Sequence, residues 1–396
     1  MSKPALNENW IDPTARKIVQ TLKSAGFETY LVGGCVRDLL AGIHPKDFDI
    51  ATNASPNEVK RKVPGSYVIG KRFRLVLVKR GLAQFEVATF RRTASQTELD
   101  DESNTNSGDN FFGTCEEDAK RRDFTINGLF YDPIDHRLID YVEGKSDVDN
   151  RVVRMIGEPR ARLIEDPIRS LRAIRLSHKL DFSVEPSLRA AILETAPELL
   201  KTALPRRREE YLKIMRLKEP LRAWLELKDL EILRAVVPTM DELLGDPASI
   251  QRFGEIFARA AWAGVDFQST SELFSAFLYS LARARSEEPE ELDPEAIEAD
   301  ERWNRLMRDE LGVFKIESTI FLIALDLLSG LKKIDAYKRK GHRRQVGFLK
   351  QESLPLALKL SQMDGSLTPA EFDFWLNEIR TKTLVNDEST RPEAAN

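Results

Sequence analysis

The sequence has little of what several common classes of protein require. Only two cysteines, Cys35 and Cys115, and four histidines occur among 396 residues, which is too few for a disulfide scaffold or a structural zinc site. No apolar run approaches the ~20 residues that a membrane span needs, and the first residues lack the basic-then-apolar pattern of a signal peptide. We therefore expect a cytoplasmic enzyme or binding protein with no membrane partner.

The net charge is also small, at −4, and at first argues against a nucleic-acid partner. The average hides segregated charge, however, because the segment 287–301 carries nine acidic residues and no basic one. The charge of the whole chain therefore says little about a local surface that could face RNA.

The chain is too long for one compact core, so we expect two or more domains. Strand-like and helical segments alternate at first, whereas helical periodicity dominates later. This order predicts an α+β protein with an N-terminal α/β head built on a mixed sheet, followed by an all-helical neck, body and tail. The expected boundaries are 1–150 for the head, 151–220 for the neck, 221–385 for the body and tail, and 386–396 for a disordered end. A polar stretch at 93–114 is expected to be a flexible insertion.

Two glycines, Gly33 and Gly34, lie between a predicted strand at 27–32 and a predicted helix at 36–41. They let backbone N–H groups approach an anion closely, the helix N-terminus adds partial positive charge, and Arg37 adds a full one. This arrangement suits a triphosphate. Taken alone, a Gly-Gly pair is more often an ordinary tight turn.

The carboxylates of Asp47 and Asp49 follow shortly after this turn, in a second predicted strand. Residues i and i+2 of a strand point to the same face, so the two carboxylates converge. Converging carboxylates repel unless a cation lies between them, and oxygen ligands of this kind suit Mg²⁺ that bridges substrate phosphates. An isolated Asp-x-Asp would more often be a solvent-facing pair, but its place after the Gly-Gly turn favours the metal.

The combination of Gly-Gly-Cys-Val-Arg-Asp at 33–38 with Asp-Phe-Asp at 47–49 resembles the nucleotidyltransferase superfamily typified by DNA polymerase beta. More narrowly, it is similar to the bacterial class II branch, which contains tRNA nucleotidyltransferases (CCA-adding enzymes) and poly(A) polymerases. The resemblance implies that the two aspartates hold catalytic Mg²⁺ ions. It also implies nucleotide contacts by the first motif, at Gly33, Gly34, Arg37 and Asp38.

A third carboxylate is expected for a two-metal site, and Glu86 lies in a segment similar to the family's. An acid within an otherwise apolar strand needs a partner to be tolerated. The alternative is an outward-facing glutamate on an alternating strand.

The segment 121–127, Arg-Arg-Asp-Phe-Thr-Ile-Asn, closely matches the family's second motif. Arg122 would neutralise phosphates, while Asp123 and Asn127 would hydrogen-bond the ribose hydroxyls that distinguish RNA precursors from deoxynucleotides. Without the other motifs, a charge cluster at a helix N-terminus would be the preferred explanation of the segment.

The segment 165–175 is predicted to open a helix, with Pro167 tolerated in its first turn. Polar residues recur there every three positions, at Asp166, Arg169, Arg172 and Arg175, which alone would suggest an exposed salt-bridge ladder. The resemblance implies instead that Asp166 and Arg169 pair with the edge of the incoming base, as a protein template, and that the next arginines face its phosphates.

Two RNA contacts are predicted in the helical part. Arg206 and Arg207 lie at the predicted head–body junction, and a later basic cluster contains Lys338, Arg339 and Arg343 with Tyr337 interleaved. Such a cluster could hold an RNA backbone and stack a base. The alternative for the later cluster is a solvated helix end.

These features together predict a template-independent RNA 3′-end nucleotidyltransferase that uses ATP, foremost a poly(A) polymerase acting on mRNA or other RNA. The segment 68–75 resembles a poly(A) polymerase signature, whereas the missing arginine-rich extension after 383 is closer to CCA-adding enzymes. A CCA-adding enzyme that uses CTP and ATP on tRNA is therefore the first alternative. A non-catalytic RNA-binding protein on the same scaffold is the second. The oligomeric state is not predicted.

Overall fold

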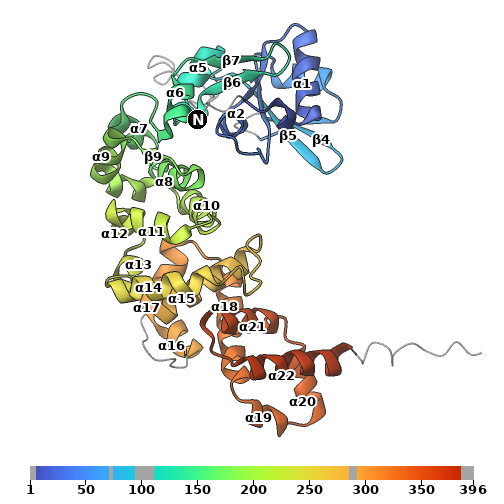
Figure 1. Ribbon diagram of the computed structural model, residues 1–396, viewed down its shortest axis with the longest axis vertical. Helices are drawn as coiled ribbons and strands as arrows, with labels where there is room; N and C mark the ends of the chain where they lie inside the picture. The colour runs from blue at the N-terminus through green and yellow to red at the C-terminus, as the bar shows by residue number, and fades with distance from the viewer. Residues whose placement is uncertain (1–5, 71–74, 94–110, 285–291, 385–396) are drawn as a thin grey trace, which may run out of the picture. The chain divides into compact units, whose positions relative to one another are not determined.

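The computed structural model describes residues 6–70, 75–93, 111–284 and 292–384 (Figure 1). Three predictions fall partly or wholly outside these residues. They are the polar insertion, of which 94–110 is not described, the signature at 68–75, and the C-terminal tail at 386–396.

The chain folds into two compact units, Met1–Thr195 and Ala196–Asn396. The division between them falls inside the segment predicted as the neck. The first unit contains a seven-stranded sheet and the second is built from helices, so the predicted fold class is confirmed.

The sheet of the first unit has the strand order β3-β4-β5-β2-β1-β6-β7. Its strands are β1 Thr29–Val32, β2 Asp49–Thr52, β3 Ser66–Ile69, β4 Leu75–Arg80, β5 Ala83–Thr89, β6 Leu129–Asp132 and β7 Arg137–Asp140. All neighbours are antiparallel except β2 and β5, which run parallel. The predicted mixed sheet is therefore present, and its single parallel pair lies at the predicted carboxylates.

Helices and short elements complete the first unit. They are η1 Glu8–Trp10, α1 Pro13–Ser24, α2 Gly34–Leu40, α3 Pro56–Lys62, α5 Cys115–Lys120, η2 Thr125–Asn127, α6 Gly144–Asn150, α7 Pro159–Glu165, α8 Arg169–Leu180 and α9 Pro186–Thr195, with a small second sheet of β8 Val152–Val153 and β9 Ser183–Val184. Helix α1 begins sharply because Asp12 accepts hydrogen bonds from Thr14 N and Ala15 N, and because proline fits the first turn.

One face of the large sheet carries an aromatic cluster. The rings of Tyr30 and Phe90 are 6.3 Å apart and those of Phe90 and Phe130 are 6.1 Å apart, and all three side chains are buried. Tyr30 pairs with Ala51, so Asp49, two residues before Ala51, points to this same face. The buried rings hold in place the strands that carry Asp49 and Glu86.

The described residues of the second unit form helices and turns only. They are η3 Ala196–Lys201, α10 Leu204–Met215, α11 Pro220–Asp229, α12 Ile232–Val236, α13 Pro238–Leu243, α14 Pro247–Ala258, α15 Thr270–Ala284, α16 Pro294–Ala299, α17 Glu301–Arg305, η4 Leu306–Glu310, α18 Lys315–Leu331, α19 Ile334–Lys338, α20 His342–Leu349, α21 Leu354–Asp364, α22 Pro369–Ile379 and η5 Arg380–Leu384. Their core includes Phe277, whose ring centroid lies 5.3 Å from that of Trp224 and 5.4 Å from that of Phe253.

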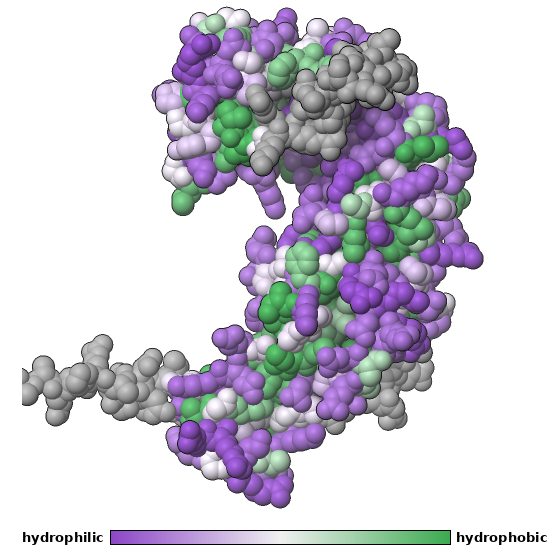
Figure 2. Space-filling view, turned by 180° about the vertical axis from the view of Figure 1, so that it is seen from behind, coloured by the Kyte–Doolittle hydropathy of each residue, from purple (hydrophilic) through white to green (hydrophobic). Residues whose placement is uncertain are grey.

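The surface is mainly polar. On the face drawn in Figure 2, hydrophilic side chains cover most of the area and apolar ones occur in smaller groups. Among the described residues, every helix is too short or too polar to traverse a lipid bilayer.

Candidate active site

The three predicted metal-binding carboxylates come to one edge of the sheet. Asp49, the first residue of β2, is the register partner of Glu86 on the parallel strand β5. Register partners on neighbouring strands point to the same face. Asp47 lies just before β2 and is close enough for its charge to act on Asp49. All three side chains are exposed. The strand pairing thus brings Glu86, which is remote in sequence, beside the Asp-x-Asp pair.

The charges of Asp47 and Glu86 act on Asp49. The pKa of Asp49 is raised from its usual 3.8 to about 6. The main cause is that surrounding protein reduces hydration of this carboxyl group even though part of the residue remains exposed, and the negative charges of Glu86 and Asp47 raise the pKa further. Arg122 acts in the opposite direction. A cation at this edge would relieve the repulsion.

The donor set fits a divalent metal ion that shares its coordination with a substrate. In the described part of the chain, no three His, Cys, Asp or Glu side chains are grouped so that they could hold an ion by themselves. Mg²⁺ is usually bound through one or two carboxylates together with substrate phosphates rather than in a cage of protein ligands. The oxygen donors at Asp47, Asp49 and Glu86 match that mode of binding.

The predicted Gly-Gly turn lies at the end of β1, next to these carboxylates. Gly33 has φ +72° and ψ −125°, a backbone conformation that residues other than glycine rarely adopt. Its N–H donates to Leu129 O at 3.1 Å. A Cβ atom on Gly33 would lie 3.2 Å from Nη1 of Arg122. Gly33 therefore makes the turn and also lets the Arg122 guanidinium approach it.

Replacing Gly33 by Ala should reduce both stability and nucleotide binding. We expect a loss of about 1–3 kcal/mol in the free energy of unfolding because of the strained backbone, together with displacement of Arg122. Gly26→Ala is the matched control, since Gly26 has φ +90° but open space around it. Urea unfolding and the KM for ATP would be measured for both. Equal KM values in the two variants would contradict the role assigned to the contact with Arg122.

Arg37 and Asp38 are buried, which differs from the expectation of a cation open to phosphate. Arg37 Nε and Nη2 donate to Asp38 Oδ1 at 2.8 and 2.6 Å, and Nη1 donates to Oδ1 of Asn127. The other oxygen of Asp38 accepts from Lys179 Nζ at 3.1 Å. Arg37 thus joins α2 to the second motif, and direct contact of Arg37 or Asp38 with a nucleotide stays a prediction.

Asp118, a buried residue of α5 that was not predicted from the sequence, holds the arginine pair of the second motif. Its Oδ2 accepts from Arg122 Nε and Nη2 at 3.1 and 2.8 Å, and its Oδ1 accepts from Arg121 Nε at 2.9 Å. Burial alone would raise the pKa of Asp118, but the charges of Arg122 and Arg121 keep it below the usual value. Asp118 lies three and four residues before the two arginines. Side chains at these spacings meet on a helix, so the spacing could have indicated the contact from the sequence.

The second motif is also joined to the predicted base-reading helix. Asp123 Oδ2 accepts from Arg172 Nε and Nη2 at 2.9 and 2.6 Å, and its Oδ1 accepts from Asn127 Nδ2 at 3.0 Å and from Phe124 N at 2.8 Å. Burial opposes ionisation, but Arg172 and these hydrogen bonds lower the pKa of Asp123. Arg172, predicted to face phosphates, therefore pairs with the carboxylate that was predicted to bind ribose.

The helix predicted over 165–175 begins later than expected. Helix α7 ends at Glu165 and α8 starts at Arg169, because Pro167 lacks an N–H and disfavours helical backbone at Asp166. Arg169 Nη1 donates to Arg162 O at 2.7 Å and to Glu165 Oε2 at 3.0 Å. Asp166 and Arg175 are half-buried. The break leaves Asp166 and Arg169 at a junction of two helices rather than along one face.

Of the two arginines predicted to contact RNA at the start of α10, only Arg206 is exposed. Arg207 is buried, and its Nη1 donates to Val236 O at 3.4 Å. The prediction of RNA contact by Arg207 is wrong because its guanidinium lies inside the second unit.

The later basic cluster keeps its charges at the surface but not its aromatic ring. Lys338, Arg339 and Arg343 are exposed. Tyr337 is buried, and its hydroxyl donates to Glu378 Oε2 at 2.7 Å. The interpretation of Tyr337 as a base-stacking residue is therefore wrong, whereas backbone contact by the three cations stays a prediction.

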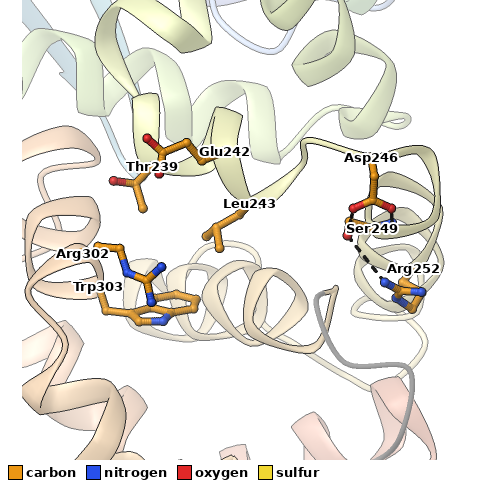
Figure 3. Close-up of a pocket in the computed structure, with 8 residues that line it drawn as sticks. All are labelled: Thr239, Glu242, Leu243, Asp246, Ser249, Arg252, Arg302 and Trp303. Carbon is orange, nitrogen blue, oxygen red and sulfur yellow. Dashed lines mark hydrogen bonds between the residues drawn. The ribbon is translucent and has the colours of Figure 1, made fainter.

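The second unit contains a separate pocket of about 610 Å³ (Figure 3). It is lined by Thr239, Glu242, Leu243, Asp246, Ser249, Arg252, Arg302 and Trp303. Figure 3 shows Trp303 and Arg302 on one side of Leu243, and the network of Asp246, Ser249 and Arg252 on the other. Asp246 Oδ2 accepts from Ser249 Oγ at 2.6 Å, and Arg302 Nη2 lies 2.8 Å from Asp300 Oδ2. Two charged residues that line the pocket, Asp246 and Arg302, are therefore already engaged by other side chains of the protein.

Two segments of the chain match models of known protein families. Residues 29–154 match the family model of the poly A polymerase head domain. Residues 181–244 match a model described as a probable RNA and SrmB-binding site of polymerase A. The carboxylates, the glycine turn and the second motif all lie within the first match.

Named relatives fall into two groups. Poly(A) polymerase I of Salmonella typhi is 39% identical over 242 residues, which are 60% of this chain and 52% of that protein. A CCA-adding enzyme of Streptococcus suis is 34% identical over 253 residues, 63% of this chain and 62% of that protein. The chain thus matches about half the length of the poly(A) polymerases.

Solved structures with the same fold include the CCA-adding enzyme of Bacillus stearothermophilus in complex with CTP. The TM-score is 0.65 at 24% identity, with 94% of this chain and 82% of that chain covered. The family suggested by the motifs is confirmed by these matches. This chain is similar to bacterial poly(A) polymerases and CCA-adding enzymes, and its residues 29–154 match the head domain of poly A polymerase.

Proposed function

We propose that the chain is an RNA 3′-end nucleotidyltransferase that uses ATP and adds AMP without a template, that is, a poly(A) polymerase of the cytoplasm. The observation that carries the proposal is the register of Asp49 with Glu86, next to the Gly33 turn and the Arg122 guanidinium. Paired carboxylates beside this glycine turn have no use in a protein that only binds RNA.

Enzymes of this family generally use divalent metal ions, and the metal proposed for this chain is Mg²⁺. Asp47, Asp49 and Glu86 are its proposed ligands. When bound, the ion supplies charge stabilisation to the phosphates and acidity to the attacking RNA 3′-hydroxyl.

The chain's own residues then have distinct tasks. Arg122, held by Asp118, balances the charge of the triphosphate beside Gly33. Asp123 and Asn127 orient the sugar. Asp166 and Arg169 are the proposed contacts to the base. Arg172 and Arg175 lie further along α8.

A CCA-adding enzyme is the second candidate, and the comparisons supply the reason for keeping it. The Streptococcus suis relative is named for this activity, and structural neighbours are described as CCA-adding enzymes in complexes with CTP, ATP and tRNA. Poly(A) polymerase is placed first because its named relatives are 39–41% identical to this chain, against 34–38% for the named CCA-adding enzymes.

The test offers ATP and CTP, alone and together, with two acceptors: a tRNA that lacks its 3′ terminus and an unstructured RNA oligomer. Long tails of A on both acceptors are expected for a poly(A) polymerase. Three ordered additions confined to the tRNA would overturn that assignment in favour of a CCA-adding enzyme. RNA binding without Mg²⁺-dependent release of pyrophosphate would overturn both and support a non-catalytic protein.

A further inference from the structure

Helix α18 of the second unit leaves an apolar row open to solvent (Figure 1). The row consists of Ile316, Ile320 and Ile323, which stand four and three residues apart and so lie on one side of the helix. Ile316 is 65% exposed, Ile323 is 41% exposed, and Ile320 between them is half-buried. Single exposed apolar residues are ordinary, whereas a continuous row marks a surface that another molecule can cover.

This isoleucine row continues into a groove of about 740 Å³ between α16 and α18. Three aliphatic side chains line the groove, namely Leu292, Leu322 and Ile323. Ile323 therefore belongs both to the row and to the groove. An apolar surface along a helix, with anchors at i, i+4 and i+7, is the kind of surface on which an amphipathic helix lays its own apolar face.

The charged walls of the groove are mainly acidic. They are Asp293, Glu295, Glu298 and Asp326, together with a single cation, Lys333. In the part of the chain that the structure describes, the carboxylates of Glu295, Glu298 and Asp326 form no ion pair. Lys333 Nζ donates to Ser329 Oγ at 3.0 Å. The groove thus carries an unbalanced negative charge beside its apolar side chains.

This charge indicates the class of partner. The carboxylates repel RNA phosphates, so the groove does not fit an RNA backbone. They equally disfavour a membrane surface, whose lipids are anionic. A positively charged protein segment is attracted instead, and the isoleucine row requires that this segment present apolar side chains at helical spacing.

We propose that the isoleucine row and the acidic groove form a docking surface for another protein, which binds there through a basic amphipathic helix. In the complex, the apolar side chains of that helix cover the isoleucine row. Its lysines or arginines pair with Glu295, Glu298 and Asp326. The proposal goes beyond the proposed function, because no step of nucleotide transfer enters it.

The test uses the full chain and a fluorescent peptide of leucine and lysine, which forms an amphipathic helix about as long as the 17 residues of α18. Fluorescence anisotropy gives the Kd of this peptide. Ile323→Ser should raise the Kd about tenfold, because it removes an apolar anchor from the centre of the surface. Glu295→Lys combined with Glu298→Lys should raise it about tenfold or more, since like charges then face one another.

Matched substitutions away from the groove are the controls. Leu376→Ser on α22 removes an apolar side chain that is 46% exposed. Asp373→Lys combined with Glu352→Lys changes two exposed acids and alters the net charge by the same amount as the groove variant. Both control proteins should bind the peptide as the wild type does. An equal loss of affinity in the charge control would mean that net charge alone attracts the peptide, and would overturn the docking surface.

Other occupants would give different results. An RNA oligomer whose own Kd rises in Ile323→Ser would identify the surface as one for RNA. A dimer seen by sedimentation velocity without peptide, and dissociated by the groove substitutions, would identify the occupant as a second copy of this chain. Either result, or a wild-type protein that shows no saturable binding of the peptide, would contradict the proposal.

Discussion

Asp49→Asn should abolish nucleotide incorporation and leave the protein at least as stable as the wild type. The amide keeps the shape of the side chain but removes the charge that a divalent cation needs. A metal ion supplies several kcal/mol of stabilisation to a phosphoryl-transfer transition state, and each ~1.4 kcal/mol is a factor of ten. We therefore expect the rate of AMP incorporation to fall by about 1,000-fold or more.

The expected gain in stability follows from the pKa of Asp49, which is raised from 3.8 to about 6 in the folded protein. The folded state binds this proton more tightly than the unfolded state, so the stability contributed by the protonated form is complete below pH 3.8. It is lost as the pH rises to about 6, where the folded protein must ionise Asp49 beside Glu86 and Asp47. Asparagine never ionises, so Asp49→Asn should have the higher melting temperature at pH 7.

The two measurements separate chemistry from folding. Incorporation of labelled AMP gives the rate, and thermal unfolding at pH 4 and pH 7 gives the stability. The matched control is Glu116→Gln on α5, another exchange of an exposed carboxylate for an amide, which should change neither. A catalytic loss accompanied by a lower melting temperature at pH 7 would contradict the repulsion between the three carboxylates.

Features that depend on neighbouring residues in sequence could be predicted here. The helix at α1 and the strand that becomes β1 follow from periodicities of 3.6 and 2. The convergence of Asp47 with Asp49 was predicted from the same period of 2, but Asp47 lies just before β2 rather than within it. Glu86 required more, because its place beside Asp49 depends on the parallel pairing of β2 with β5 across an intervening helix and two strands. The resemblance to the family supplied what local pattern could not.

The partners of the arginines could not be predicted in the same way. Each guanidinium was assigned to phosphate or RNA from its charge, but its burial is decided by elements far away in sequence. Arg172 pairs with Asp123, 49 positions earlier, and Arg37 bonds Asn127, 90 positions later. A positive charge in a motif predicts that an anion is near, whereas only the fold determines whether that anion is a ligand or a carboxylate of the protein.

Three consecutive arginines at the start of α10 provide the clearest case. Arg206 is exposed, whereas Arg207 and Arg208 are buried. Arg208 Nη2 donates to Glu317 Oε1 at 2.6 Å, and its guanidinium lies 4.2 Å from the ring centroid of Phe314. The pair joins α10 to α18 across 109 positions of sequence.

Glu317 is itself fully engaged inside the second unit. Its Oε1 also accepts from Thr270 Oγ1 at 2.6 Å, and its Oε2 accepts from Phe314 N at 2.8 Å. Only 3% of Glu317 is exposed. A carboxylate in this position is stable because a cation and two hydrogen bonds replace the water that it has lost.

Arg208→Ala should therefore destabilise the second unit strongly. Removal of one member of a buried ion pair leaves the other charged and unpaired, at a cost of about 3–5 kcal/mol. Arg206→Ala, two residues away on the surface, should change the unfolding free energy by less than about 0.5 kcal/mol and should instead weaken RNA binding. The contrast tests whether the arginines divide between stability and RNA contact.

Tryptophan fluorescence during urea unfolding is the appropriate measurement. Trp224, Trp262, Trp303 and Trp375 lie in the second unit and Trp10 alone in the first, so the signal follows mainly the unit that Arg208 stabilises. The reciprocal variant Glu317→Ala should produce a loss of similar size, because it leaves Arg208 as the unpaired charge. The opposite result would be an Arg208→Ala variant that unfolds at the wild-type urea concentration but binds RNA more weakly. All three arginines would then belong to the RNA surface, and the burial of Arg207 and Arg208 would have no energetic consequence.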